Sequence, residues 1–250
     1  GPGTARQRLM ASLGVICARA GSKRLPGKNL KPLRGVPLLG YVCRAARASR
    51  IDRVILSTED AAIARAAAAF GVEAPFERPR ALAADYASSP DIVGHAIDWM
   101  AANGGGAYDI AVLIQPTTPF LTPADIDACL DAVASGTASA FTVRQATEPP
   151  EWMFVHGPDG AARTLLGDPI AGAREHSQHV RTCYVPTGGA YAVRVAAMRS
   201  QGRIICDPAH LVETTPERAA DIDDELDFLY AEMLAEHFDF GLIPAQECEP

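Results

Sequence analysis

The chain has 250 residues and a formal net charge of −7; 48% of its residues are hydrophobic and 21% are charged. This balance is typical of a soluble globular protein with one large core, and it predicts a single domain spanning residues 1–250. The acidic charge argues against non-specific nucleic-acid binding, and the lack of an unbroken run of about 18 apolar residues argues against a membrane span. Residues 1–4 lack the pattern of a secretory signal and are typical of a cleaved tag, so we expect a cytoplasmic protein.

Apolar runs bounded by turn residues alternate with amphipathic stretches along the chain, which predicts repeated βα units and a doubly wound, largely parallel α/β sheet. The predicted strands are 13–18, 53–57, 72–76, 109–116, 138–143, 188–195 and 203–206. The predicted helices are 37–49, 58–71, 89–104, one starting at 122 and 224–237, with N-caps at Thr58, Ser89 and Thr122.

The alternation breaks between residues 145 and 187, which hold prolines, glycines and three of the six histidines. This segment is too long for a simple connection and is typical of an insertion. His176 and His179 invite a metal-ligand reading, but without a third ligand we favour an anion contact or surface exposure. The six cysteines form no C-x-x-C pair, so neither a zinc site nor a disulfide framework is indicated.

A basic loop, ARAGSKRLPGKN at 18–29, follows the first predicted strand. In a parallel sheet, ligands bind at the carboxyl ends of the strands, where this loop begins. Its glycines allow close approach to a ligand, and its hydroxyl and basic side chains suit phosphate oxygens; these residues are Gly21, Gly27, Ser22, Arg19, Lys23 and Lys28. The loop has neither the Walker nor the dinucleotide-binding pattern. The residues alone therefore predict an anion-binding loop, with a solvated basic loop as the alternative.

Asp221 and Asp223 are separated by Ile222, so an extended backbone would direct both carboxylates to one side and the isoleucine into the core. Two such carboxylates suit a divalent ion that also binds phosphate oxygens. The alternative is a solvated turn whose neighbouring acids favour the start of a helix.

The basic loop resembles the signature of the cytidylyltransferases that make CMP-sialic acids and related CMP-nonulosonates, the CMP-N-acylneuraminate synthetase family. Further matches occur in the expected order and span nearly the whole chain: DRVILSTED, ERPRALAADYASS, LIQPTTPF, GGAYAV and DIDDELDF. The resemblance implies a three-layer Rossmann-like nucleotidyltransferase fold with a small dimerisation insertion. It also implies that an acceptor oxygen attacks the α-phosphorus of CTP and that pyrophosphate leaves.

The resemblance further implies a set of residue roles. Arg19, Ser22, Lys23 and Lys28 would hold the triphosphate, Asn29 the ribose or a phosphate, Arg78 the cytosine, and Ala87 and Ser89 the base and α-phosphate. Arg19, Lys23, Asp221 and Asp223 would be catalytic, and the two aspartates would hold Mg²⁺ or another divalent cation. Gln115, Thr117, Tyr191, Arg174, Gln178 and Arg181 would face the acceptor. Ser89 could equally be only a helix N-cap.

The acceptor half of the site departs from the family pattern. Leu121 in QPTTPFLT stands where many sialic-acid enzymes have an arginine, Trp152 lies in a segment that lacks the usual lysine, and Gly188-Gly189 replaces Asn-Gly. The expected acceptor is therefore a nonulosonate or another acid, such as a small phosphonate. We expect a homodimer in which the 145–187 arm reaches the partner's site. A non-catalytic CTP sensor and, less favoured, a nicotinamide oxidoreductase are the alternative functions.

Overall fold

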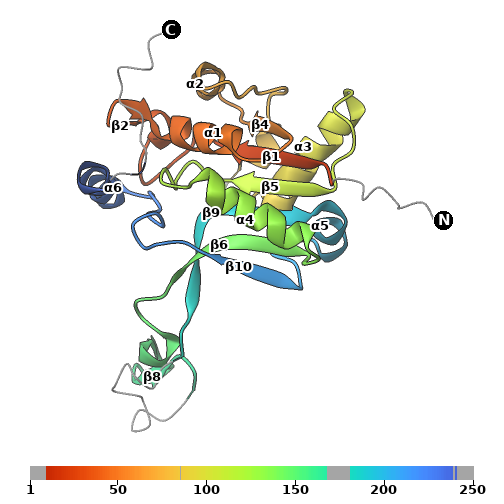
Figure 1. Ribbon diagram of the computed structural model, residues 1–250. Coiled ribbons are helices and arrows are strands. Elements are labelled where there is room, and N and C mark those ends of the chain that lie inside the picture. Colours follow the sequence, from red (N-terminus) through yellow and green to blue (C-terminus); the bar gives the residue numbers. More distant parts are fainter. Residues whose placement is uncertain (1–9, 85, 168–180, 239, 241–250) are drawn as a thin grey trace, which may run out of the picture.

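The computed structural model describes residues 10–84, 86–167, 181–238 and 240 (Figure 1). A six-stranded sheet forms its centre, in the order β10-β6-β9-β5-β1-β4. These strands are β1 (Ser12–Cys17), β4 (Arg53–Ser57), β5 (Ile110–Ile114), β6 (Ser139–Gln145), β9 (Tyr184–Arg194) and β10 (Ala209–Glu213). β1 pairs in parallel with β4 and β5, and β10 with β6, whereas β9 is antiparallel to both of its neighbours. The predicted α/β fold with a mainly parallel sheet is confirmed.

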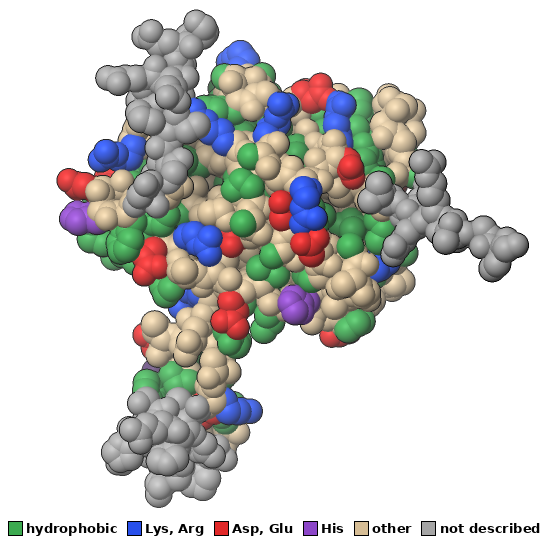
Figure 2. Space-filling model, in the orientation of Figure 1, with side chains coloured by type: hydrophobic (Ala, Val, Ile, Leu, Met, Phe, Trp, Pro, Cys, Tyr) green, Lys and Arg blue, Asp and Glu red, His purple; other side chains and the backbone are tan. Residues whose placement is uncertain are grey.

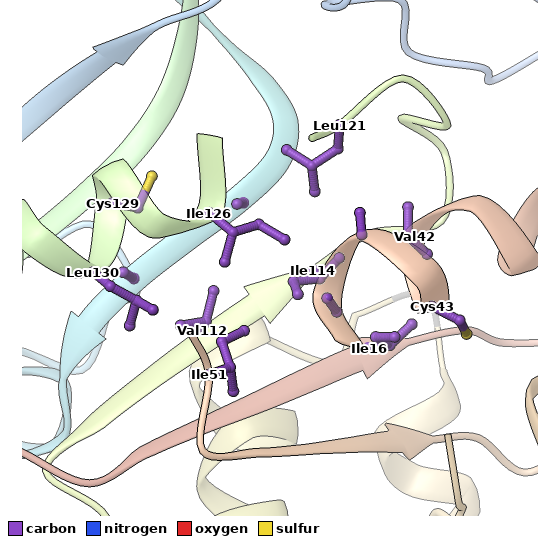
Figure 3. Close-up of a cluster of buried hydrophobic side chains, with 14 of the residues drawn as sticks. Ile16, Val42, Cys43, Ile51, Val112, Ile114, Leu121, Ile126, Cys129 and Leu130 are labelled. Carbon is purple, nitrogen blue, oxygen red and sulfur yellow. The ribbon is translucent and has the colours of Figure 1, made fainter. Parts of the chain in front are cut away.

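Helices cover both faces of this sheet. They are α1 (Leu38–Ala48), α2 (Ala61–Ala69), α3 (Ser89–Ala102), α4 (Pro123–Ala134), α5 (Val195–Gln201) and α6 (Glu225–His237). On one face, α1, α2 and α4 pack over the sheet; Figure 3 shows Ile16 and Ile114 of the strands beneath Val42 of α1 and Ile126 of α4. On the other face, α3 and α5 pack together over β1, β5 and β9.

A third apolar cluster joins α6 to the small hairpin of β2 (Pro32–Leu33) and β3 (Val36–Pro37). Phe120 and Ile222 are fully buried in this cluster, next to Phe228 of α6. The cluster therefore anchors the last helix beside the segments that follow β1 and β5.

Two predicted strands are wrong. Residues 72–76 form one isolated bridge, between Glu73 and Ile55 of β4, because Pro75 lacks the N–H that a continuous ladder needs. Residues 203–206 form a bend, and the strand lies at Ala209–Glu213. The apolar character of this bend comes from Ile204 and Cys206, which are buried against the α3 and α5 face.

Two predicted helix caps shift along the chain. The N-cap of α2 is Asp60 rather than Thr58, since its carboxylate accepts the N–H groups of Ala62 and Ile63. The N-cap of α3 is Ser88, which leaves Ser89 as the first helical residue. Thr122 caps α4 as predicted.

An arm leaves the sheet between β6 and β9, where the insertion is predicted (Figure 1). Gln145 pairs with Tyr184 at its base, and the small hairpin of β7 (Phe154–His156) and β8 (Ala162–Thr164) lies within it. The pairing of β6 with β9 is irregular between Phe141 and Val143. This irregularity divides β9 into a half that belongs to the arm and a half that belongs to the central sheet.

On the face shown in Figure 2, acidic and basic side chains are interspersed over the body of the molecule. Within the described part of the chain, no helix has the length and apolar character needed to cross a bilayer.

Thr122 and Asp125 form a reciprocal capping box at the start of α4, with the Thr122 hydroxyl 2.6 Å from an Asp125 carboxylate oxygen. We expect Thr122→Ala to lower the free energy of unfolding by about 1 kcal/mol and the melting temperature by roughly 2–4 °C. Thr122→Ser keeps the hydroxyl and is the matched control. Thermal unfolding in which both variants lose equal stability would contradict the role of the cap.

Candidate functional site

A cavity of about 600 Å³ opens at the carboxyl ends of β1 and β5. It is lined by residues from the basic loop, the segments after β4 and β5, the start of α3 and the acidic segment before α6. Those predicted from the sequence are Arg19, Ser22, Lys23, Lys28, Asn29, Arg78, Ala87, Ser89, Gln115, Thr117, Asp221 and Asp223. The predicted nucleotide and metal residues thus lie around one space, although they come from distant parts of the chain.

The basic loop takes its shape from bonds to its backbone. The Asn29 side-chain amide donates to the Arg19 carbonyl at 2.9 Å, and the Ala20 N–H donates to the Glu59 carboxylate at 2.8 Å. Gly27 adopts a φ of +70°, a left-handed conformation that favours glycine, just before the short helix that contains Lys28 and Asn29. The loop therefore presents its hydroxyl and basic side chains from a defined backbone.

Arg78 is a buried arginine, only 3% exposed, that lines the cavity. Its Nε donates to the Ser57 hydroxyl at 2.9 Å, and a terminal guanidinium nitrogen donates to the Ser57 carbonyl. Its backbone N–H donates to the Thr58 carbonyl, so the end of β4 holds both the main chain and the side chain. A guanidinium fixed in this way is a rigid hydrogen-bond donor.

Cys17 lies at the end of β1 and also lines the cavity. Desolvation raises the pKa of its thiol to about 11, although the Arg78 charge opposes the shift. The thiol is therefore neutral near pH 7 and acts as part of the cavity wall.

The acidic segment before α6 has the predicted arrangement. Ile222 is fully buried, its N–H donates to the Thr117 carbonyl at 2.8 Å, and the carboxylates on either side of it line the cavity. Burial raises the pKa of Asp221, with an opposing hydrogen bond from Thr117 and a reinforcing charge from Asp223.

Two cations of the basic loop meet Asp223. Lys28 Nζ lies 3.1 Å from one carboxylate oxygen and Arg24 lies 2.5 Å from the other. Desolvation alone would raise the pKa of Asp223, but the hydrogen bond and charge of Lys28, together with Arg24, lower it. Asp223 is therefore ionised across the neutral pH range.

Gly188 lies beside Gln115 and Asp221, two of the residues that line the cavity. Its φ is +83°, and a Cβ there would lie 3.1 Å from Gln115 Oε1 and 3.4 Å from Asp221 Oδ2. Substitution would thus strain the backbone and crowd both polar groups. A bare backbone at this position keeps the space beside Gln115 and Asp221 open.

Ser88, not Ser89, caps α3, as its hydroxyl accepts the Asp91 N–H. Ser89 lines the cavity from the first turn of the helix. The two interpretations of Ser89 are thereby separated: the neighbouring serine supplies the cap, and Ser89 stands where a helix N-terminus faces the cavity, a position that favours phosphate.

Some predicted acceptor residues do not line the cavity. The Tyr191 ring stacks on Phe141 and packs against the apolar cluster on the α3 and α5 face. Burial and the charge of Asp221 raise the pKa of its hydroxyl, against a hydrogen bond from the Gly188 backbone, so the half-buried side chain lies beside the cavity without lining it. Arg181 lies on the arm, 3.0 Å from Glu151. Arg174 and Gln178 fall outside the described residues, as do His176 and His179.

The cavity also has walls that the sequence interpretation did not assign. Arg24 belongs to the basic loop but was given no role, and Leu82, Ala84, Ile92 and Leu113 supply apolar walls. Two of these residues, Leu82 and Ala84, lie in the motif ERPRALAADYASS. Assigning the whole motif to the site, rather than its polar residues alone, would have identified them. Glu59 had no signal beyond its place in DRVILSTED.

The donor set at Asp221 and Asp223 fits a hard divalent cation. Both carboxylates face the cavity, and oxygen ligands are those that Mg²⁺ prefers. Within the described ranges, no group of three or more acidic, histidine or cysteine side chains could hold a metal ion. A cation here would therefore take its remaining ligands from phosphate oxygens and water, as Mg²⁺ does at nucleotide sites.

The chain is similar to two curated enzymes that act on sugar acids. Pseudaminic acid cytidylyltransferase from Campylobacter jejuni is 40% identical over 113 residues, which cover 45% of this chain and 48% of that enzyme. 3-deoxy-manno-octulosonate cytidylyltransferase from Afipia carboxidovorans is 31% identical over 199 residues, which cover 75% of this chain and 74% of that enzyme. The chain thus matches about half the length of the first relative and about three quarters of the second.

Among solved structures, the fold resembles CMP:2-keto-3-deoxy-manno-octonic acid synthetase in complex with CTP. The TM-score is 0.60 at 22% sequence identity, and the match covers 90% of this chain and 99% of the other. This likeness supports the fold.

The model of the cytidylyltransferase family matches residues 13–225. This range contains the basic loop, the segment after β4, the end of β5 and both cavity aspartates. The predicted relationship is confirmed: the chain belongs to the cytidylyltransferase family.

Proposed function

We propose that the chain transfers CMP from CTP to an acidic sugar of the nonulosonate type and releases pyrophosphate. The observation that carries this proposal is the convergence of a cationic loop, a buried arginine and two carboxylates on one cavity. The relatives' sugar-acid substrates support this acceptor class.

In this proposal the acceptor oxygen forms a bond to the α-phosphorus of CTP, and the bond to the pyrophosphate leaving group breaks. Catalysis of such a step depends mainly on positioning and on stabilising negative charge. Arg19, Lys23 and Lys28 would hold the phosphate oxygens in line, while Ser22 and Ser89 would donate hydrogen bonds to them. Their common position on the cavity wall supports these roles.

Arg78 would donate a hydrogen bond to an oxygen of the cytosine base. Because Ser57 binds the guanidinium through two of its nitrogens, the remaining donors point in a fixed direction. Gln115 and Thr117, at the end of β5, would face the acceptor beside the open backbone of Gly188.

Asp221 and Asp223 would hold a divalent cation, which we propose to be Mg²⁺. When bound, this ion supplies positive charge against the phosphate oxygens. Asp223 contacts Lys28 and Arg24 of the basic loop. A metal ion bound to this carboxylate would therefore share it with these two side chains.

We further propose that the protein works as a homodimer in which the arm covers part of the partner. Six large apolar side chains of the arm are 38–52% exposed: Trp152, Met153, Phe154, Val155, Leu165 and Leu166. The arm projects away from the body of its own chain (Figure 1), so a second copy is a suitable cover for this surface.

Replacing Asp221 with Asn keeps the shape of the side chain but removes the charge that a cation needs. We expect kcat/KM to fall by on the order of 100-fold or more. The measurement is pyrophosphate release from CTP with a panel of nonulosonic acids, Kdo-like acids and phosphonates. Glu225→Gln is the control, because Glu225 pairs with Lys31 and does not line the cavity.

Undiminished turnover by Asp221→Asn would exclude the metal role of this residue. CTP binding by the wild-type protein without turnover on any acid of the panel would favour a nucleotide sensor. Turnover confined to phosphonates would replace the proposed acceptor class.

Replacing Trp152 and Phe154 with Glu places charge on the exposed apolar surface of the arm. If this surface joins two copies, sedimentation should show a monomer, because burying unpaired charge is costly. Arg163→Glu, a charge change on the same hairpin, is the control. A wild-type protein that sediments as a monomer would contradict the proposed dimer.

A further inference from the structure

The basic loop lacks regular secondary structure between residues 18 and 25, so individual hydrogen bonds set its shape. The Ala18 N–H donates to the Ser57 carbonyl, and the Arg19 carbonyl accepts from Asn29. The Ala20 N–H donates to Glu59 Oε1 at 2.8 Å. Of these three bonds, the last is the one in which a side chain from outside the loop accepts an N–H of the loop backbone.

The local structure holds Glu59 in place from both sides. The preceding Thr58 is 2% exposed, and its carbonyl accepts the Arg78 N–H. The following Asp60 caps α2 through bonds to two backbone N–H groups. The main chain at Glu59 is therefore tied both to the end of β4 and to the first turn of a helix.

The second carboxylate oxygen of Glu59 is buried and has no hydrogen-bond partner among the described residues. A buried carboxylate oxygen without a partner is costly, which means that its position needs an explanation. Arg19 directly precedes the alanine that Glu59 holds, and the loop is rich in positive charge. A negative charge behind the loop offsets the repulsion among these cations while they face the cavity.

Glu59 does not itself line the cavity. A direct bond to the nucleotide is therefore not the role that the geometry supports. Its contact with Ala20 places it behind the loop, between the segment that contains Arg19 and the segment that contains Arg78.

We infer that Glu59 is a positioning residue that fixes the backbone of the phosphate-binding loop by accepting the Ala20 N–H. This inference rests on the proposed function, because it assumes that the loop holds the phosphates of CTP. Loss of Glu59 should weaken the binding of phosphates and leave the binding of the nucleoside unchanged.

Two variants separate the hydrogen bond from the charge. Glu59→Ala removes both, whereas Glu59→Gln keeps an oxygen that can accept the Ala20 N–H. We expect Glu59→Ala to weaken CTP binding by on the order of 10-fold and Glu59→Gln to recover most of this loss. Calorimetric titration with CTP, pyrophosphate and cytidine gives the affinities, and the KM for CTP should rise while the KM for the acid stays constant.

Asp60→Asn is the matched control, because it alters the neighbouring carboxylate, which caps α2 by accepting the N–H groups of Ala62 and Ile63. It should change both the melting temperature and the CTP affinity little, because asparagine is as good an N-cap as aspartate. Equal losses for CTP and cytidine in Glu59→Ala would show a general disturbance of the cavity and overturn the inference. Equal losses in Glu59→Gln and Glu59→Ala would also overturn it, because the hydrogen bond would then not be the cause.

The wild-type titration separates this inference from the proposed function. If the wild-type protein binds no CTP, the proposed function fails. If it binds CTP and Glu59→Ala binds equally well, the proposed function stands and the positioning role of Glu59 fails.

Discussion

The cavity depends on the backbone hydrogen bond from Ile222 to Thr117 together with the burial of the Ile222 side chain. These two residues are far apart in the chain, and their contact brings the acidic segment to the end of β5. The apolar cluster beneath α6 holds the isoleucine, so the position of both aspartates depends on core packing. The buried side chain of Ile222 thus fixes the position of the two polar side chains next to it.

The same contact explains how an acidic protein maintains a cationic cavity. Lys28 and Arg24 of the basic loop meet Asp223, and Lys31 meets Glu225 at the start of α6. Opposite charges thus face each other across the space between the basic loop and α6. The carboxylates offset the repulsion among the closely spaced cations. A bound triphosphate and its divalent cation would continue this alternating arrangement of positive and negative charges.

The parts of the fold that the sequence predicted well are those where local pattern and packing agree. The predicted strand 53–57 matches β4, and the Thr122 cap is in place. The prediction failed at 203–206, where apolar side chains pack a bend into the core, since hydrophobicity alone does not distinguish these cases. Most candidate site residues could be named because their motifs are local. The position of Tyr191 and the bond from Ala20 to Glu59 depend on contacts between distant segments, which no local pattern specifies.

The irregular pairing in the middle of β9 has a mechanical consequence. The arm half of the strand pairs around Tyr184 and the core half around Tyr191, with Gly188 in the left-handed conformation between them. Any change in the angle of the arm would therefore pivot at the residue that lies against Gln115 and Asp221. The joint of the arm therefore lies directly beside Gln115 and Asp221 of the cavity wall, so a force on the distant hairpin would act first at the point where the acceptor is expected to bind.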